Sequence, residues 1–212
     1  KDSEKGKCLP NLVITISRTM GSGARVIAEK LAEELGWSFW GKELIEAIAK
    51  DADVSRKVVE PFDENTISEI ELIARAALGD HEMGDFLYVR HLAKAVISIE
   101  KLGNAIILGR GANFILSNAL HVRIDAPFET RVQNMIKFEG MHYDDAVATL
   151  KHSDHDRHRF LVSLFGKERA EKTHFDLTLW MDKLTNDEAV HILKAAVKAR
   201  CETMKAENLP RT

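Results

Sequence analysis

A glycine-rich turn stands between an apolar run and a helical pattern near the start of the chain. The run Leu12–Ser17 ends at Arg18, and Gly21-Ser22-Gly23 follows just before the helical spacing of residues 26–35. Glycine lets the backbone turn tightly and brings its N–H groups close to a ligand, while a helix N-terminus adds unpaired donors and about half a positive charge. Such a turn suits a phosphate group, to which Arg18 and Arg25 could add bidentate contacts. The alternative is an ordinary tight turn with two solvent-facing arginines.

A further arginine follows another buried strand. The run Asn104–Leu108 reads as a strand and is followed by Arg110 between two glycines. In open α/β sheets, ligands bind outside the carboxyl ends of the strands, so Arg110 is expected to face the glycine-rich turn across a crevice. The alternative is a structural arginine that holds a loop in place. Asp125, which ends the strand 121–125, either points into the same crevice or caps the turn before Pro127.

The segment 152–159 is dense in charged and imidazole groups and admits three interpretations. His152, His155 and Arg159 share one helical face, while Arg157 lies away from Arg159. The composition alone favours a solvated, charged helix. The second interpretation is a metal site built from His152, His155 and Asp156. The third is a lid whose arginines close on a phosphate group during its transfer.

Alternating strands and helices must position these residues. Short runs of β-branched or alternating apolar residues predict strands, and helical spacing predicts helices between them. The predicted strands are 12–17, 37–40, 104–108, 121–125 and 175–180, and the predicted helices are 26–35, 42–50, 67–78, 86–102, 127–138, 144–165 and 187–205. Five strands separated by helices predict an α/β fold with a parallel sheet.

Length and composition bound the class of protein. The 212 residues suffice for one full-sized domain, so we expect a single domain over 1–212 with a mostly helical insertion at about 54–88. A 45% apolar share argues against wholesale disorder, and a net charge of −3 argues against a nucleic-acid coat or a basic membrane-surface protein. The sequence has neither an apolar run of the ~18 residues needed for a membrane span nor an apolar signal core after its charged start, which predicts a cytoplasmic protein.

With these pieces in order, the chain resembles the cytidylate kinase-like branch of the P-loop nucleoside monophosphate kinases. The stretch 14–28 looks like the Ile-Ser-Arg…Gly-Ser-Gly start of that branch. Further similar stretches lie at 36–45, 62–64, 109–114, 126–131, 154–157 and 175–177. The resemblance extends over about 12–199.

The resemblance implies a three-layer P-loop kinase-type fold with sheet order 2-3-1-4-5, a helical insertion that binds the monophosphate, and a lid-type segment at about 152–170. It implies transfer of the γ-phosphoryl group of ATP to CMP or dCMP with Mg²⁺. The partners would then be small-molecule nucleotides, with neither nucleic acid nor membrane, and the sequence carries no argument about a homodimer. By position, the implied residues are Arg18, Gly21, Ser22 and Gly23 for the ATP phosphates, Arg90 and Arg110 for the monophosphate, and Arg25, Arg157 and Arg159 for catalysis.

Several positions depart from a full P-loop kinase pattern. Where the loop has Lys after its last glycine and a Ser/Thr ligand for Mg²⁺ two residues later, this chain has Ala24 and Val26. Gly41 and Gly111 replace acidic residues of the family pattern, so pyrimidine selectivity does not follow from the resemblance. Two functions are therefore open: a kinase in which Arg25 or Arg18 replaces part of the lysine's charge, or a regulatory protein that binds nucleotides without transferring phosphate.

Overall fold

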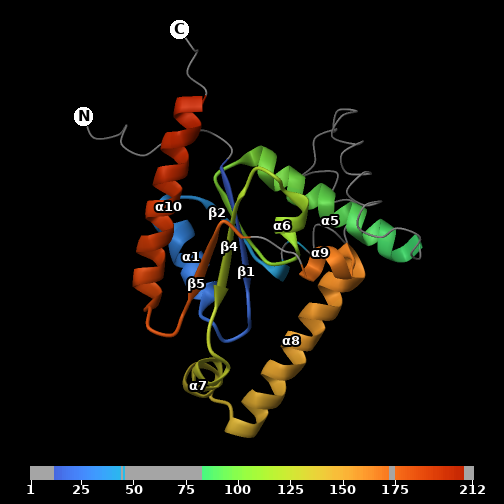
Figure 1. The fold of residues 1–212 in the computed structure, drawn as a ribbon, viewed down its shortest axis with the longest axis vertical. Helices are drawn as coiled ribbons and strands as arrows, with labels where there is room; N and C mark the ends of the chain where they lie inside the picture. The colour runs from blue at the N-terminus through green and yellow to red at the C-terminus, as the bar shows by residue number, and fades with distance from the viewer. Residues whose placement is uncertain (1–11, 44, 46–82, 172–174, 208–212) are drawn as a thin grey trace.

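The apolar runs of the sequence form the strands of one parallel sheet (Figure 1). A computed structural model describes residues 12–43, 45, 83–171 and 175–207. The strands are β1 (Val13–Arg18), β2 (Ser38–Trp40), β3 (Ala105–Leu108), β4 (Leu120–Asp125) and β5 (Leu177–Trp180). They pair in parallel in the order β2-β3-β1-β4-β5. The α/β class and the strand order are thus confirmed.

The described connections between the strands contain helices, as the periodicity predicts. The described helices are α1 (Ala24–Leu35), α5 (Met83–Leu102), α6 (Ala112–Ile115), α7 (Phe128–Glu139), α8 (Tyr143–Phe165), α9 (Lys167–Glu171) and α10 (Asn186–Glu207). The helix predicted over 67–78 and residues 54–82 of the predicted insertion lie outside the described residues. Of the helices that are described, none combines the length and apolar character needed to cross a membrane.

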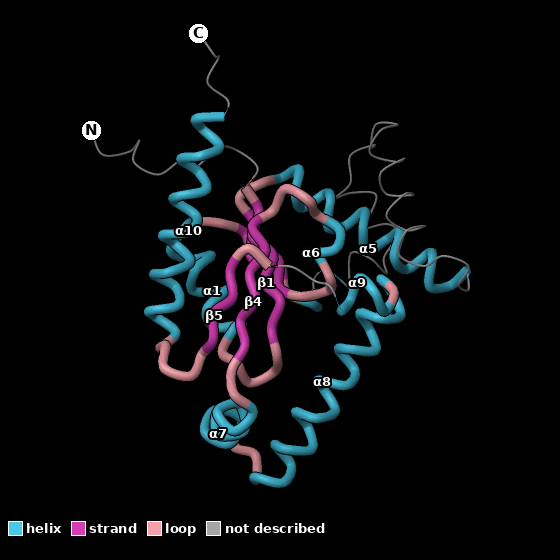
Figure 2. The backbone as a smooth tube through the Cα atoms, in the orientation of Figure 1, coloured by secondary structure: helices cyan, strands magenta, loops and turns pink. Residues whose placement is uncertain are grey.

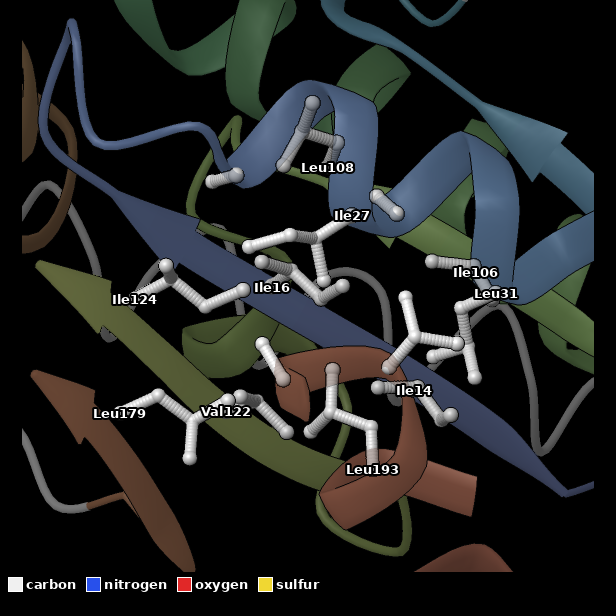
Figure 3. Close-up of a cluster of buried hydrophobic side chains, with 14 of the residues drawn as sticks. Ile14, Ile16, Ile27, Leu31, Ile106, Leu108, Val122, Ile124, Leu179 and Leu193 are labelled. Carbon is white, nitrogen blue, oxygen red and sulfur yellow. The ribbon is translucent and has the colours of Figure 1, made fainter. Parts of the chain in front are cut away.

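The sheet lies between two layers of helices, and alternate residues of β1 supply the two cores. Figure 1 shows α1 and α10 on one face and α5 and α6 on the other. Ile14 and Ile16 pack with side chains from α1 and α10, among them Ile27 and Leu193 (Figure 3). On the opposite face, Val13 packs with apolar residues of α5, α6 and the end of α8.

The α8-facing side of β1 and β4 becomes polar toward the carboxyl ends of the strands. Thr15 and Ser17 pair in register with His121 and Arg123, and all four occupy alternate positions of their strands. Figure 2 shows that β4 leads into α7, from which α8 runs back alongside the sheet. A separate small core that includes Val132 holds α7 against α8. The fold therefore places a polar, helix-covered surface where the strands end.

Candidate anion-binding site

The glycine-rich turn leads from β1 into the first turn of α1. Gly21 and Gly23 have φ angles of +78° and +80°, a backbone region that favours glycine. The Ser22 hydroxyl donates to the Thr19 carbonyl over 2.8 Å and closes the turn. Helix α1 begins at Ala24 without a side-chain cap and without an acidic residue in its first turn. Its amide donors and the positive end of its dipole therefore suit a bound anion.

Two guanidinium groups meet at Ser17 beside this turn, and a third, that of Arg18, lies near enough for its charge to interact with theirs. Arg123 Nη1 and Arg157 Nη2 donate to Ser17 Oγ over 3.3 and 2.6 Å, respectively. Arg18, the last residue of β1, lies against Gly109, where an added Cβ would clash with Arg18 Nη1. Arg18, Arg123 and Arg157, here called the arginine cluster, come from two strands and from α8.

A carboxylate lies among these cations and connects them to the turn. Asp125 accepts hydrogen bonds from the Thr19 hydroxyl, from Arg123 Nη2 at 2.7 Å and from the Ala126 amide at 2.9 Å. Burial alone would raise the pKa of Asp125, but the hydrogen bonds from Thr19 and Arg123 outweigh it and lower the pKa. The carboxylate therefore both borders the site and caps the turn that follows β4.

The arginine cluster holds positive charge where water is scarce. Burial, together with the charges of Arg123 and Arg18, lowers the pKa of Arg157 to about 10. Burial also lowers the pKa of Arg18, while the Glu43 carboxylate raises it. Arg157 is still protonated at neutral pH, because its pKa lies well above 7. A bound phosphate group would offset the desolvation cost of these guanidinium groups and reduce their mutual repulsion.

A cavity of about 290 Å³ opens between the sheet and α8 at this point. Ser17, Arg123 and Arg157 belong to its polar lining, and Phe114 and Phe175 belong to its aromatic lining. The Arg123 guanidinium carbon lies 6.0 Å from the centre of the Phe175 ring. Clustered cations beside aromatic rings suit a phosphorylated ligand that also has a planar or apolar part.

Two arginines predicted for catalysis lie at the surface. Arg25 Nε lies 2.9 Å from Glu29 Oε1 and Arg25 Nη1 lies 3.6 Å from Glu43 Oε2, with the Arg25 side chain 60% exposed. Arg159 is exposed on α8, on the helix side away from Arg157. The charges of Arg18 and Arg157 thus interact, while Arg25, whose charge also acts on Arg18, and Arg159 have exposed side chains.

The two arginines predicted for the monophosphate lie toward α5 and α8. Arg110, with φ of +58°, follows β3, and its guanidinium carbon lies 4.7 Å from the centre of the Phe160 ring on α8. Arg90 is partly buried on α5, which packs against β3 and α6. Their assignment to a monophosphate stays a prediction.

The segment 152–159 forms part of α8, and its two faces differ. His152 and Asp156 form an exposed ion pair of 3.1 Å, and His155 is also exposed. Within the ranges that the structure describes, no three His, Cys, Asp or Glu side chains are grouped as metal ligands. The outer face is thus solvated, and the lid interpretation of the inner face that bears Arg157 stays a prediction.

Sequence reasoning missed one member of the arginine cluster. Arg123 lies in the predicted strand 121–125 but has no role in the predicted site. Polar residues alternate in this strand with the buried Val122 and Ile124. This alternation, in a strand expected to be buried on both faces, is the signal that could have found Arg123. Arg131 on α7, which is 6% exposed and donates two hydrogen bonds to Asp154 of α8, also has no role in the predicted site.

The strand order and the glycine-rich turn between β1 and α1 define a P-loop kinase-type fold. The sequence profile of the cytidylate kinase-like family matches residues 13–183, and the chain belongs to this family. The cytidylate kinase of Pyrococcus horikoshii is 26% identical over 188 residues, which cover 88% of each chain. The cytidylate kinase of Methanopyrus kandleri is 27% identical over 192 residues, which cover 88% of this chain and 93% of that relative.

A solved structure of similar fold aligns with most of this chain. An uncharacterized protein from Eubacterium ventriosum aligns with a TM-score of 0.62 and 25% identity. The alignment covers 89% of this chain and 99% of that protein. Family and fold together support a nucleoside monophosphate kinase.

Proposed function

We propose that this protein is an ATP-dependent nucleoside monophosphate kinase that transfers the γ-phosphoryl group to CMP, dCMP or a related monophosphate. The observation that carries the proposal is the arginine cluster, which lies beside the uncapped N-terminus of α1 and pairs with one carboxylate, Asp125. Phosphoryl transfer is catalysed mainly by positioning and by neutralising charge, and these groups are suited to both tasks. The names of the curated relatives favour a cytidine monophosphate acceptor.

In this proposal arginines replace the missing lysine of the loop. Ala24 is buried and Val26 is 55% exposed, and neither side chain can donate to a phosphate. Arg18 enters the site from the end of β1 instead, and a guanidinium can bind two phosphate oxygens at once. Arg157 on α8 would neutralise charge on the phosphoryl group as it moves. Arg25 and Arg159 are proposed to join from the surface when nucleotides bind.

Magnesium would enter the site with the nucleotide. Mg²⁺ usually keeps several waters and takes most of its other ligands from substrate phosphates and one or two carboxylates. The Thr19 hydroxyl and the Asp125 carboxylate provide oxygen atoms at the glycine-rich turn and fit this requirement. When bound, the ion would neutralise charge on the donor phosphates.

The decisive experiment follows diphosphate formation from ATP, Mg²⁺ and each of CMP, dCMP, UMP, AMP and GMP. We expect turnover with at least one cytidine monophosphate. The second candidate function is a nucleotide-binding regulatory protein without transferase activity, which Ala24 and Val26 favour. ATP binding without turnover on the whole panel would establish that second function and refute the kinase.

The acceptor assignment has its own test. Arg110→Ala should weaken binding of the preferred monophosphate about tenfold or more, because a charged hydrogen bond to phosphate is lost. Binding is measured by calorimetry without ATP, and circular dichroism checks the fold. A monophosphate dissociation constant equal to that of the wild type would remove Arg110 from the site.

A further inference from the structure

Helix α7 contacts the glycine-rich turn through two side chains one helical turn apart. Asn134 Nδ2 donates to the Gly21 carbonyl over 2.8 Å, and Arg131 Nη1 lies 3.5 Å from the Met20 carbonyl oxygen. Together with the bond from Ser22 to Thr19, these contacts occupy three consecutive carbonyl oxygens of the turn. These three carbonyl oxygens are therefore engaged by groups of the protein itself.

The backbones of α7 and the turn also approach closely. A Cβ at Gly21 would lie 3.0 Å from the Arg131 carbonyl oxygen and 3.1 Å from Arg131 Cβ. The positive φ of Gly21 adds a second reason for glycine at this position. The turn thus rests directly on α7.

Arg131 also connects the turn to α8. Its Nη1 and Nη2 atoms donate to both carboxylate oxygens of Asp154 over 3.0 and 2.9 Å. Asp154 precedes Arg157 by three residues and therefore shares its helix face. The buried Arg131 guanidinium thus contacts both the glycine-rich turn and α8. Arg157, also on α8, donates to Ser17 just before that turn.

We infer that Asn134 and Arg131 are positioning residues of the phosphate site. These two side chains hold the Met20 and Gly21 carbonyls on the α7 side. The backbone amides of the turn then face the arginine cluster before any ligand arrives. An anion is then bound without first reorienting the turn, which lowers the free-energy cost of binding. Arg131 also sets the position of Arg157 through Asp154. The inference rests on the proposed function only in naming the anion as a nucleotide phosphate.

Asn134 offers the cleaner test, because it is partly exposed and makes one described bond to the turn. Asn134→Ala removes the donor, and Asn134→Asp replaces it with an acceptor that repels both the carbonyl and an incoming anion. The matched control is Gln133→Ala, since Gln133 is exposed and its amide bonds to Glu129 on the same helix. Calorimetry with inorganic tripolyphosphate measures anion binding, and the best acceptor of the panel measures transfer.

We expect Asn134→Ala to raise the dissociation constant of tripolyphosphate about three- to tenfold, the range that one hydrogen bond supports. Asn134→Asp should raise it further, and Gln133→Ala should leave it unchanged. Arg131→Lys keeps the charge but loses the bidentate pairing with Asp154, so it should lower kcat more than it raises KM. If Arg131→Lys fails to fold, the two Asn134 variants still decide the question.

The outcomes for the inference and for the kinase separate. A tripolyphosphate dissociation constant that stays at the wild-type value in both Asn134 variants overturns the inference and leaves the kinase standing. Anion binding that depends on Asn134 in a protein without transfer supports the inference and overturns the kinase. A wild-type protein that binds no tripolyphosphate overturns the inference, because the turn would then have no anion to bind.

Discussion

The positively charged guanidinium of Arg157 lies near two other guanidinium groups, those of Arg123 and Arg18. Burial and the charges of Arg123 and Arg18 lower its pKa to about 10, so the nucleotide-free fold holds this charge at a cost. Residues arranged for catalysis are often unfavourable for stability, because their partner is the ligand. Arg157 therefore allows function and stability to be separated by one substitution.

We predict that Arg157→Met lowers kcat/KM at least about a hundredfold and leaves the thermal midpoint of the ligand-free protein equal or higher. Methionine keeps an unbranched side chain that fills the space of the arginine's methylene groups and removes the repelling charge, while Ser17 keeps its bond from Arg123. Lys151→Met, which removes an exposed cation from the same helix, is the control for both measurements. A clearly lower midpoint together with normal transfer would show that Arg157 is structural.

Gly109 tests the position of Arg18. A Cβ at Gly109 would clash with Arg18 Nη1, and its φ is +83°. Gly36 has a similar φ of +66° but no atom within 4 Å of an added Cβ. Alanine at either position should lower the free energy of unfolding by about 1–2 kcal/mol through backbone strain. Only Gly109→Ala should also weaken ATP binding, because it displaces Arg18. Equal ATP affinity in the two variants would contradict this role of Arg18.

At the scale of elements, strands and long helices were predictable because each has a strong local signal. The β-branched run before Arg18 predicts β1 to within one residue at each end, and the spacing of 144–165 predicts α8. Helix α6 has four residues and no periodicity to read. The meeting of Ser17 with Arg123 depends on β4 lying next to β1, and residue spacing within a strand carries no information on strand order.

The contact between α7 and α8 gives a prediction about these elements. Asp154→Asn should weaken the pair with Arg131 and increase amide hydrogen exchange in α8, because one of its anchors on α7 is lost. Asp156→Asn is the matched control, since Asp156 lies on the same helix and pairs with exposed His152. Mass spectrometry of peptides from 143–165 measures the difference. Equal exchange in the two variants would mean that the apolar contacts between α7 and α8 suffice.

At the scale of the whole molecule, the family resemblance predicted what periodicity could not. The strand order followed from the resemblance, and with it the meeting of the ends of β1, β3 and β4 around one site. The i,i+4 spacing of Arg25 and Glu29 on α1 was readable from the sequence, but the contact of Arg25 with Glu43, which lies outside α1, depends on the tertiary structure. In the proposed function the buried Arg18, more than the exposed Arg25, replaces the charge of the missing loop lysine.

The pH dependence of stability is a property of the whole fold that one partly buried histidine should influence. His121 Nδ1 on β4 lies 2.7 Å from Thr15 Oγ1 on β1. Burial lowers the pKa of His121 below 6.5, while the charge of Asp176 opposes this effect. Between the lowered pKa and about 6.5, the unfolded chain binds more protons than the folded one. The free energy of unfolding should therefore rise with pH through this window and fall when the solution is acidified.

We expect His121→Gln to reduce the loss of stability between about pH 7.5 and pH 5.5, because glutamine can still bond to Thr15 but does not titrate. Urea unfolding at both pH values measures the loss. Part of it should persist, since burial also lowers the pKa of His91. His155→Gln, at an exposed position on α8, controls for removing a histidine. If the two variants lose the same stability as the wild type, the acid sensitivity arises elsewhere, and the His121–Thr15 contact does not couple the central strands to pH.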